Sequence, residues 1–210
     1  MSLTATTIPP ADTDNPDGLV IVLHGWGSNS ADLVSLSPML DFANCYFAFP
    51  DAPLPHPHAP QGLMWYDLDN EGYEGLEESR DRLKTWLTEI TTELKIPFEK
   101  TILAGFSQGG AMTLDVGLEF PFAGLVSLSG YLHHNPQEDL SNAPPILIMH
   151  GTRDPVVPLQ MAELAQKNLS KRGATVTYAN FPMDHSICPD EIFQFGQFIR
   201  DRLTDGDTND

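Results

Sequence analysis

The sequence predicts an α/β protein in which helices cover both faces of a mostly parallel central sheet. Short apolar segments of strand length alternate along the chain with longer amphipathic segments, as strands alternate with crossover helices. The short segments are apolar almost throughout, as is typical of strands buried on both faces. The chain has 210 residues, of which 41% are hydrophobic, enough for one sizeable core. We therefore expect a three-layer α/β sandwich.

Six segments rich in Val, Ile, Leu or aromatic residues are bounded by Gly, Pro, Asp or Ser and are expected to form the strands. They are residues 19–23, 46–49, 101–104, 125–128, 146–149 and 176–178. Three amphipathic segments repeat their apolar residues at helical spacing. Their apolar faces are Leu83, Trp86, Leu87, Ile90 and Leu94; Met161, Leu164, Ala165 and Leu169; and Ile192, Phe195, Ile199 and Leu203.

We expect residues 19–203 to form one domain. Residues 1–18 are rich in Thr, Pro and Asp and are expected to be a flexible N-terminal segment, and residues 204–210 a flexible acidic tail. The connection 51–77 is dense in Pro, His and Gly and is expected to form a partial flap over the site. The connection 130–145 is too short and too interrupted by Pro to form a helical cap, so no large cap domain is expected.

Composition argues against several classes of partner. With 11 Lys and Arg against 29 Asp and Glu, the formal net charge is −18, which disfavours nucleic acids and anionic membrane surfaces. No segment approaches the roughly 20 apolar residues of a membrane span, and residues 1–18 lack the regions of a secretory signal. We expect a cytoplasmic protein without a stable membrane anchor, a monomer or a homodimer, with Cys45 and Cys188 as free thiols.

A serine lies in the pattern G-x-S-x-G directly after the strand 101–104. The segment reads Gly105, Phe106, Ser107, Gln108, Gly109, and a helix-compatible segment follows it. Strand, tight turn and helix in this order form a nucleophile elbow, in which small flanking residues allow the turn that projects the hydroxyl. The alternative is a purely structural turn from strand to helix. We predict that Ser107 is a nucleophile.

A serine nucleophile needs a base and an acid that orients the base, and in this fold they follow it in the order acid, then histidine. Asp154 lies on a Pro-rich loop just after the strand 146–149, and His185 follows the strand 176–178. His133 and His134 precede the later acid candidates and would reverse the order. Asp184 is a poor acid partner because it is adjacent to His185 in sequence. We therefore predict a Ser107, His185 and Asp154 triad.

Acyl transfer also needs donors for a developing oxyanion, and rigid backbone N–H groups are the usual ones. Gln108 supplies one N–H at the start of the predicted helix after Ser107. The glycine-rich turn 23–28 after the first strand supplies a second, which we assign to Trp26. His56 and His58 have no carboxylate or Cys at metal-ligand spacing beside them, so neither a metal nor another cofactor is expected.

Several motifs occur in one order over nearly the whole chain. They are L-H-G-W-G at 23–27, M-W-Y-D-L at 64–68, G-F-S-Q-G-G-A at 105–111, L-S-G-Y-L at 128–132, H-G-T-R-D-P-V-V-P at 150–158 and D-H-S-I-C at 184–188. In these motifs the sequence resembles the carboxylesterase and acyl-protein thioesterase family of α/β hydrolases. The resemblance implies the same triad, the same oxyanion donors and an acyl pocket flanked by the Trp65 region, with Met64 and Tyr66 as further substrate-binding residues. Trp26 stands where the family commonly has Leu.

These observations together predict a serine hydrolase that cleaves carboxylic esters of short to medium acyl chains through an acyl-enzyme on Ser107. The substrate is expected to be a small-molecule ester or thioester, with acylated proteins as a further candidate. Two alternatives stay open. The apolar loop around Trp65 would also suit a lysophospholipase, and the fold also occurs in non-catalytic binding proteins.

Overall fold

The computed structural model describes residues 2–42, 44–70 and 72–204. Its centre is a seven-stranded sheet in the order β1-β3-β2-β6-β7-β8-β9, in which all neighbours are parallel except β1 and β3. Those strands are β1 (Ala5–Ile8), β2 (Gly18–Leu23), β3 (Cys45–Pro50), β6 (Thr101–Phe106), β7 (Gly124–Leu128), β8 (Ile146–Gly151) and β9 (Val176–Phe181). The predicted fold class and all six predicted strands are confirmed.

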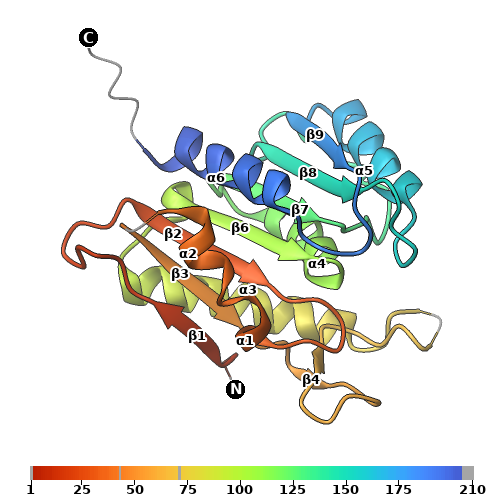
Figure 1. Ribbon diagram of the computed structural model, residues 1–210, viewed down its shortest axis with the longest axis horizontal. Helices are drawn as coiled ribbons and strands as arrows, with labels where there is room; N and C mark the ends of the chain where they lie inside the picture. The colour runs from red at the N-terminus through yellow and green to blue at the C-terminus, as the bar shows by residue number, and fades with distance from the viewer. Residues whose placement is uncertain (1, 43, 71, 205–210) are drawn as a thin grey trace.

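Helices cover both faces of this sheet (Figure 1). They are α1 (Ser30–Leu33), α2 (Leu36–Leu40), α3 (Leu76–Leu94), α4 (Gln108–Val116), α5 (Leu159–Lys171) and α6 (Pro189–Leu203), with short 3-10 turns at Phe98–Lys100 and Gly117–Glu119. The three helices predicted from apolar spacing are α3, α5 and α6. No helix among the described residues is both long and apolar enough to cross a membrane.

The strand β2 shows why the central segments are apolar at every position. Leu19, Ile21 and Leu23 belong to the core shared with α3, α4 and α5. Val20 and Val22 belong to the core on the opposite face, which includes residues of α1, α2 and α6. Because successive side chains of a strand point to opposite faces, a strand covered on both sides needs apolar residues throughout.

The N-terminal segment differs from the expectation that residues 1–18 are flexible. Residues Ala5–Ile8 form β1, which pairs antiparallel with β3 from Ala5 opposite Pro50 to Ile8 opposite Phe47. Its first three side chains are exposed, so β1 is joined to the sheet mainly through its backbone and has no apolar pattern to reveal it. Of the predicted tail 204–210, residues 205–210 lie outside the described part of the chain.

The connection 51–77 contains a small second sheet of β4 (Leu54–Pro55) and β5 (Leu63–Met64). An isolated bridge between Ser28 and Leu63 joins it to the turn after β2. The described residues form no separate cap domain over the sheet (Figure 1). Because β2, β6, β8 and β9 run parallel, the loops that follow them all emerge at one edge, where sites form in such sheets.

Candidate active site

Ser107 lies in a strained turn between β6 and α4, with φ at 55° and ψ at −116°. The turn requires glycine on both sides. A Cβ added to Gly105 would lie 2.2 Å from the carbonyl oxygen of Gly109, and one added to Gly109 would lie 2.2 Å from that of Leu23. Since real Cβ atoms do not approach so closely, the two glycines of G-x-S-x-G allow α4 to pack against β6 and the end of β2. This is the geometry of a nucleophile elbow.

The structure brings the three predicted triad residues into one hydrogen-bonded chain. His185 Nε2 is 2.9 Å from Ser107 Oγ, and His185 Nδ1 is 2.7 Å from Asp154 Oδ2. The imidazole packs against Phe106 in a tilted arrangement, with ring centroids 4.8 Å apart and an angle of 42° between the rings. With Nδ1–H donating to the carboxylate, Nε2 is free to accept the proton of the serine hydroxyl, so the geometry suits general-base activation of Ser107.

The loop after β8 holds the Asp154 carboxylate in place. Its Oδ1 accepts hydrogen bonds from the N–H groups of Val156, at 2.8 Å, and Val157, at 2.9 Å, while the side chain is fully buried. Burial by itself would raise the pKa of Asp154, but the hydrogen bond from His185 and those from the two backbone groups outweigh it, so the pKa lies below its ordinary value. Asp154 is therefore an ionised acceptor that fixes the orientation of His185.

The turn predicted to complete the oxyanion hole lies directly against the nucleophile. A Cβ added to Gly25 would be 3.4 Å from the Cβ of Ser107. The N–H of Gly27 donates to the carbonyl of Leu63 at 2.9 Å, and the N–H of Ser28 donates to that of Gly25 at 3.3 Å. Gln108 begins α4, where the first N–H groups of a helix have no partner within the helix. Trp26 and Gln108 thus lie on the two loops that adjoin Ser107.

A cavity of about 370 Å³ opens beside the nucleophile. Most of its lining comes from the turn after β2, from α1, and from the ends of β6 and β9: Gly25, Trp26, Ser28, Asp32, Leu33, Phe106, Ser107, His185, Ser186 and Ile187. Trp26, Leu33, Phe106 and Ile187 give it an apolar part. Ser28 and Asp32, whose side chains are hydrogen-bonded at 2.6 Å, give it a polar end. A larger cavity of about 570 Å³ beside Arg80 and Asp115 contains no triad residue.

The predicted substrate-binding residues Met64, Trp65 and Tyr66 do not line the cavity beside Ser107. Trp65 and Tyr66 are fully buried, and Met64 is partly buried in the β4–β5 sheet. The M-W-Y-D-L motif predicts that aromatic residues lie near the site. It does not reveal whether their side chains point into the cavity or into the core. The cavity residues Asp32, Leu33 and Ile187 were not predicted, because only their position after strand ends distinguishes them in the sequence.

Tyr66 belongs to a buried polar network behind the site. Its hydroxyl is 2.7 Å from both the hydroxyl of Tyr131 and Nε2 of His133. The other ring nitrogen of His133 lies 3.2 Å from the carboxylate of Asp115, which also accepts two hydrogen bonds from Arg80. Burial raises the pKa of Tyr131 to about 12, and burial likewise raises the pKa of Tyr66. Both are therefore neutral hydroxyls.

Three further histidines, His24, His56 and His150, have structural partners. His24 is fully buried, its Nδ1–H donates to the carbonyl of Gly25, and its Nε2 accepts from Ala52 N–H. Burial lowers the pKa of His24. His150 donates from Nε2 to the carbonyl of Val157 at 2.8 Å and so joins the end of β8 to the loop that carries Asp154. His56 Nδ1 accepts from two backbone N–H groups and its ring packs against Trp26.

Within residues 2–42, 44–70 and 72–204, no group of three or more His, Cys, Asp or Glu is arranged to hold a metal ion. Cys45 and Cys188 are not joined by a disulfide. Burial raises the pKa of the Cys45 thiol to about 12, so this residue is a small apolar core side chain rather than a reactive thiolate.

A profile of the phospholipase/carboxylesterase family matches residues 6–203. The chain is 29% identical to acyl-protein thioesterase 1 of Neurospora crassa over 86% of this chain and 82% of that protein. It is also 29% identical to acyl-protein thioesterase 1 of Mycosarcoma maydis over 94% and 96% of the two chains. Among solved structures, esterase PE8 superposes with a TM-score of 0.87 at 29% identity, covering 97% of this chain and all of that one. The chain therefore belongs to the phospholipase/carboxylesterase family and is a hydrolase with the α/β-hydrolase fold.

Proposed function

We propose that this hydrolase cleaves carboxylic esters of short to medium acyl chains through a covalent acyl-enzyme on Ser107. The observation that carries the proposal is the continuous hydrogen-bonded chain from Ser107 through His185 to the buried carboxylate of Asp154. In the first step Ser107 Oγ bonds to the carbonyl carbon and its proton passes to His185 Nε2. The carbonyl electron pair moves to oxygen, and the N–H groups of Trp26 and Gln108 stabilise that charge.

The tetrahedral intermediate then collapses, and the bond to the leaving group breaks as His185 gives its proton to the departing alcohol or thiol. Water enters next, gives a proton to His185 and adds to the acyl carbon. Expulsion of Ser107 releases the acid and restores the hydroxyl. Because the N–H donors act in both halves of the cycle and no step needs a further acid, the residues described are sufficient for it.

The cavity beside Ser107 supports the proposed chain length. Its volume of about 370 Å³ and its apolar wall of Trp26, Leu33 and Ile187 suit a short to medium acyl group. The Asp32 carboxylate at its polar end would lose hydration if a long alkyl chain covered it, which opposes long acyl groups. The relatives named acyl-protein thioesterase 1 suggest acyl thioesters, including acylated proteins, as a second substrate class for this same site.

The test combines active-site labelling with a substrate panel. We expect a fluorophosphonate probe to label one serine per chain, with p-nitrophenyl acetate and butyrate turned over faster than long-chain esters. Acyl thioesters and lysophospholipids in the same panel distinguish an esterase from a thioesterase and a lysophospholipase. Absence of both labelling and turnover would indicate the non-catalytic binding protein instead.

A further inference from the structure

We infer that Trp65 is a positioning residue that fixes the distance between the two halves of the oxyanion hole. The inference rests on the proposed function, because it assigns Trp65 a role in the site where Trp26 and Gln108 stabilise the oxyanion. These two donors lie on different loops, one after β2 and one at the start of α4. Some part of the structure must hold both loops at one separation for the two N–H groups to converge on one oxygen atom.

The first connection runs from Trp65 to the nucleophile helix. The backbone N–H of Trp65 donates to Gln108 Oε1 at 2.8 Å, and Gln108 Nε2 donates to the carbonyl of Tyr66 at 2.7 Å. The side-chain amide of Gln108 is fully buried, so these hydrogen bonds form away from water. Gln108, whose backbone N–H is assigned to the oxyanion, is thus held through its side chain by the backbone N–H of Trp65 and the carbonyl of Tyr66.

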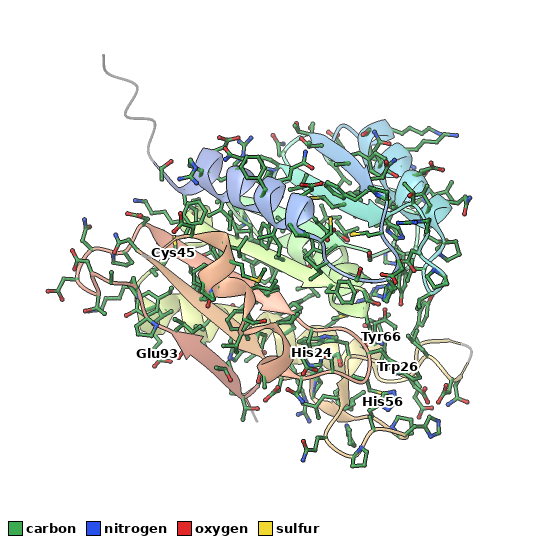
Figure 2. The ribbon with its side chains drawn as sticks, viewed as in Figure 1. His24, Trp26, Cys45, His56, Tyr66 and Glu93 are labelled. Atoms are coloured by element: carbon green, nitrogen blue, oxygen red, sulfur yellow. The ribbon has the colours of Figure 1, made fainter. Side chains whose placement is uncertain are left out.

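The second connection runs from Trp65 to the turn after β2. Its indole Nε1–H donates to the carbonyl of His24 at 3.0 Å, two residues before Trp26. His24 is itself fixed, because its ring bonds to Gly25 on one side and to Ala52 on the other. Figure 2 shows His24, Trp26 and Tyr66 in the lower right half of the view. Trp65 therefore spans both loops with one rigid side chain and its own backbone.

Surrounding contacts keep Trp65, the spacer between the two loops, rigid. Trp65 is fully buried, and its carbonyl accepts a hydrogen bond from the buried hydroxyl of Ser79 on α3. Two residues earlier, Leu63 accepts from Gly27 N–H and donates to the carbonyl of Ser28, which ties the same segment to the oxyanion turn. A buried Trp without contact to substrate explains why the M-W-Y-D-L segment lies beside the site yet does not line its cavity.

A displacement of about 1 Å at a reacting group can cost roughly 100-fold in rate, and loss of one oxyanion donor costs about 100- to 1000-fold. We therefore expect Trp65→Phe, which removes the indole N–H, to lower kcat for p-nitrophenyl acetate by about 10- to 100-fold. KM should change little, because the donors act in the transition state. The inhibition constant of a trifluoromethyl ketone, whose adduct with Ser107 carries an oxyanion, should rise by a similar factor.

Two further variants and a matched control make the test specific. Gln108→Met keeps the backbone N–H but breaks the other end of the spacer, and should reproduce the same pattern. Replacing Trp65 by β-(3-benzothienyl)alanine puts sulfur in place of N–H with little change of shape, so it isolates the bond to His24 even if Trp65→Phe folds poorly. Trp86→Phe changes another buried Trp, on α3, and should lower the melting temperature without altering kcat or ketone affinity.

If the benzothienyl protein and Gln108→Met keep wild-type kcat and ketone affinity, the spacer role is wrong. That result is separable from failure of the proposed function. In the latter case wild type and Trp86→Phe would also lack ester turnover and fluorophosphonate labelling.

Discussion

Ser107 carries a backbone conformation that few residues with a side chain adopt, and the strain is compensated by the contacts of its neighbours. Its N–H donates to the carbonyl of Leu128 on β7, and its own carbonyl accepts from Ala111 in the first turn of α4. The positive φ thus persists because strand, turn and helix are fixed independently of it. In this conformation the Ser107 hydroxyl lies 2.9 Å from His185 Nε2.

Replacing Asp154 by Asn should separate the role of this acid in catalysis from its role in folding. In Asp154→Asn the amide oxygen can still accept from Val156 and Val157, but its NH₂ group cannot accept from His185. We expect kcat to fall by about four orders of magnitude while stability changes little. Asp154→Ala should also lose stability, because two buried N–H groups would lack an acceptor.

Steady-state kinetics and urea denaturation of both variants check this prediction. Asp184→Asn is the matched control, since Asp184 is exposed and adjacent to His185 but is not bonded to its ring. A comparable loss of kcat in Asp184→Asn would contradict the assignment of Asp154.

The hydrogen-bonded arrangement of Ser107, His185 and Asp154 could be predicted from sequence, and the contacts of Trp65 could not. Ser107, Asp154 and His185 each follow a strand in an order that the fold dictates, so chain position alone carries the information. For Trp65 the sequence shows an aromatic residue near the site. Whether its ring faces the cavity or the core depends on long-range partners such as His24 and Gln108, which sequence spacing does not reveal.

At the scale of elements, α6 begins four residues after His185 and buries a carboxyl group in its first turn. Glu191 is only 1% exposed, and burial raises its pKa to about 8. The folded state thus favours the protonated form, whereas in the unfolded chain Glu191 ionises near the ordinary glutamate pKa of 4.5. The stability associated with this group is complete below about pH 4.5 and is lost as pH rises toward about 8.

Glu191→Gln, which mimics the protonated carboxyl, should therefore stabilise the protein at alkaline pH. We expect the free energy of unfolding to increase by about 2–4 kcal/mol at pH 8.5 and to change little at pH 4, since one pKa unit corresponds to about 1.4 kcal/mol. Urea denaturation at both pH values measures this. The control, Asp190→Asn, alters the exposed neighbour, and an equal gain there would point to helix-terminal charge instead.

The ion pair between Arg80 on α3 and Asp115 on α4 should contribute to stability with the opposite pH dependence. Burial alone would raise the pKa of Asp115, but hydrogen bonds from His133 and Arg80 lower it to about 2. Stability from this group is present above the ordinary aspartate pKa of 3.8 and is lost as pH falls toward about 2. Asp115→Asn, which leaves Arg80 without its buried partner, should cost about 3 kcal/mol at pH 7.

Thermal or urea denaturation from pH 7 to pH 2 checks the Asp115 prediction, and the deficit of the variant should shrink toward pH 2. Asp81→Asn changes an exposed carboxylate on α3 and should have little effect at any pH. If the loss of stability in Asp115→Asn were the same at every pH, Asp115 would contribute through the packing of its side chain and not through its charge.

Strands and helices with a long apolar pattern could be predicted from the sequence, whereas short elements and a strand joined mainly through its backbone could not. The strands β2 and β6 are apolar because both faces are covered. The strand β1 has mostly exposed side chains, and α1 and α2 are too short to show helical periodicity. Their positions depend on partners elsewhere in the chain, such as the register of β1 with β3.

For the whole molecule, the net charge of −18 should determine which esters reach the site fastest. An acidic surface attracts cations and repels anions over roughly 10 Å at 0.1 M salt, and Asp32 adds a negative charge at the cavity itself. We expect kcat/KM for a cationic ester to exceed that of an anionic ester of equal size at low salt. The ratio should fall toward one at about 1 M salt, where charges are screened.

Initial rates for a matched ester pair across a salt series measure this effect. Asp32→Asn should reduce the ratio at low salt without changing the rate for a neutral ester. A ratio that does not respond to salt would show that long-range charge has no part in substrate choice.

The order of strands in the chain has a consequence for synthesis. Ser107, the proposed nucleophile, lies at the end of β6 near the middle of the chain, whereas His185, the proposed base, follows β9, the last strand of the sheet to leave the ribosome. A nascent chain that ends before β9 already contains Ser107 but lacks His185, so its serine is not activated. In the proposed mechanism, hydrolytic activity therefore begins only when β9 has been made and has paired with β8, so a truncated chain that ends before β9 should not react with a fluorophosphonate probe.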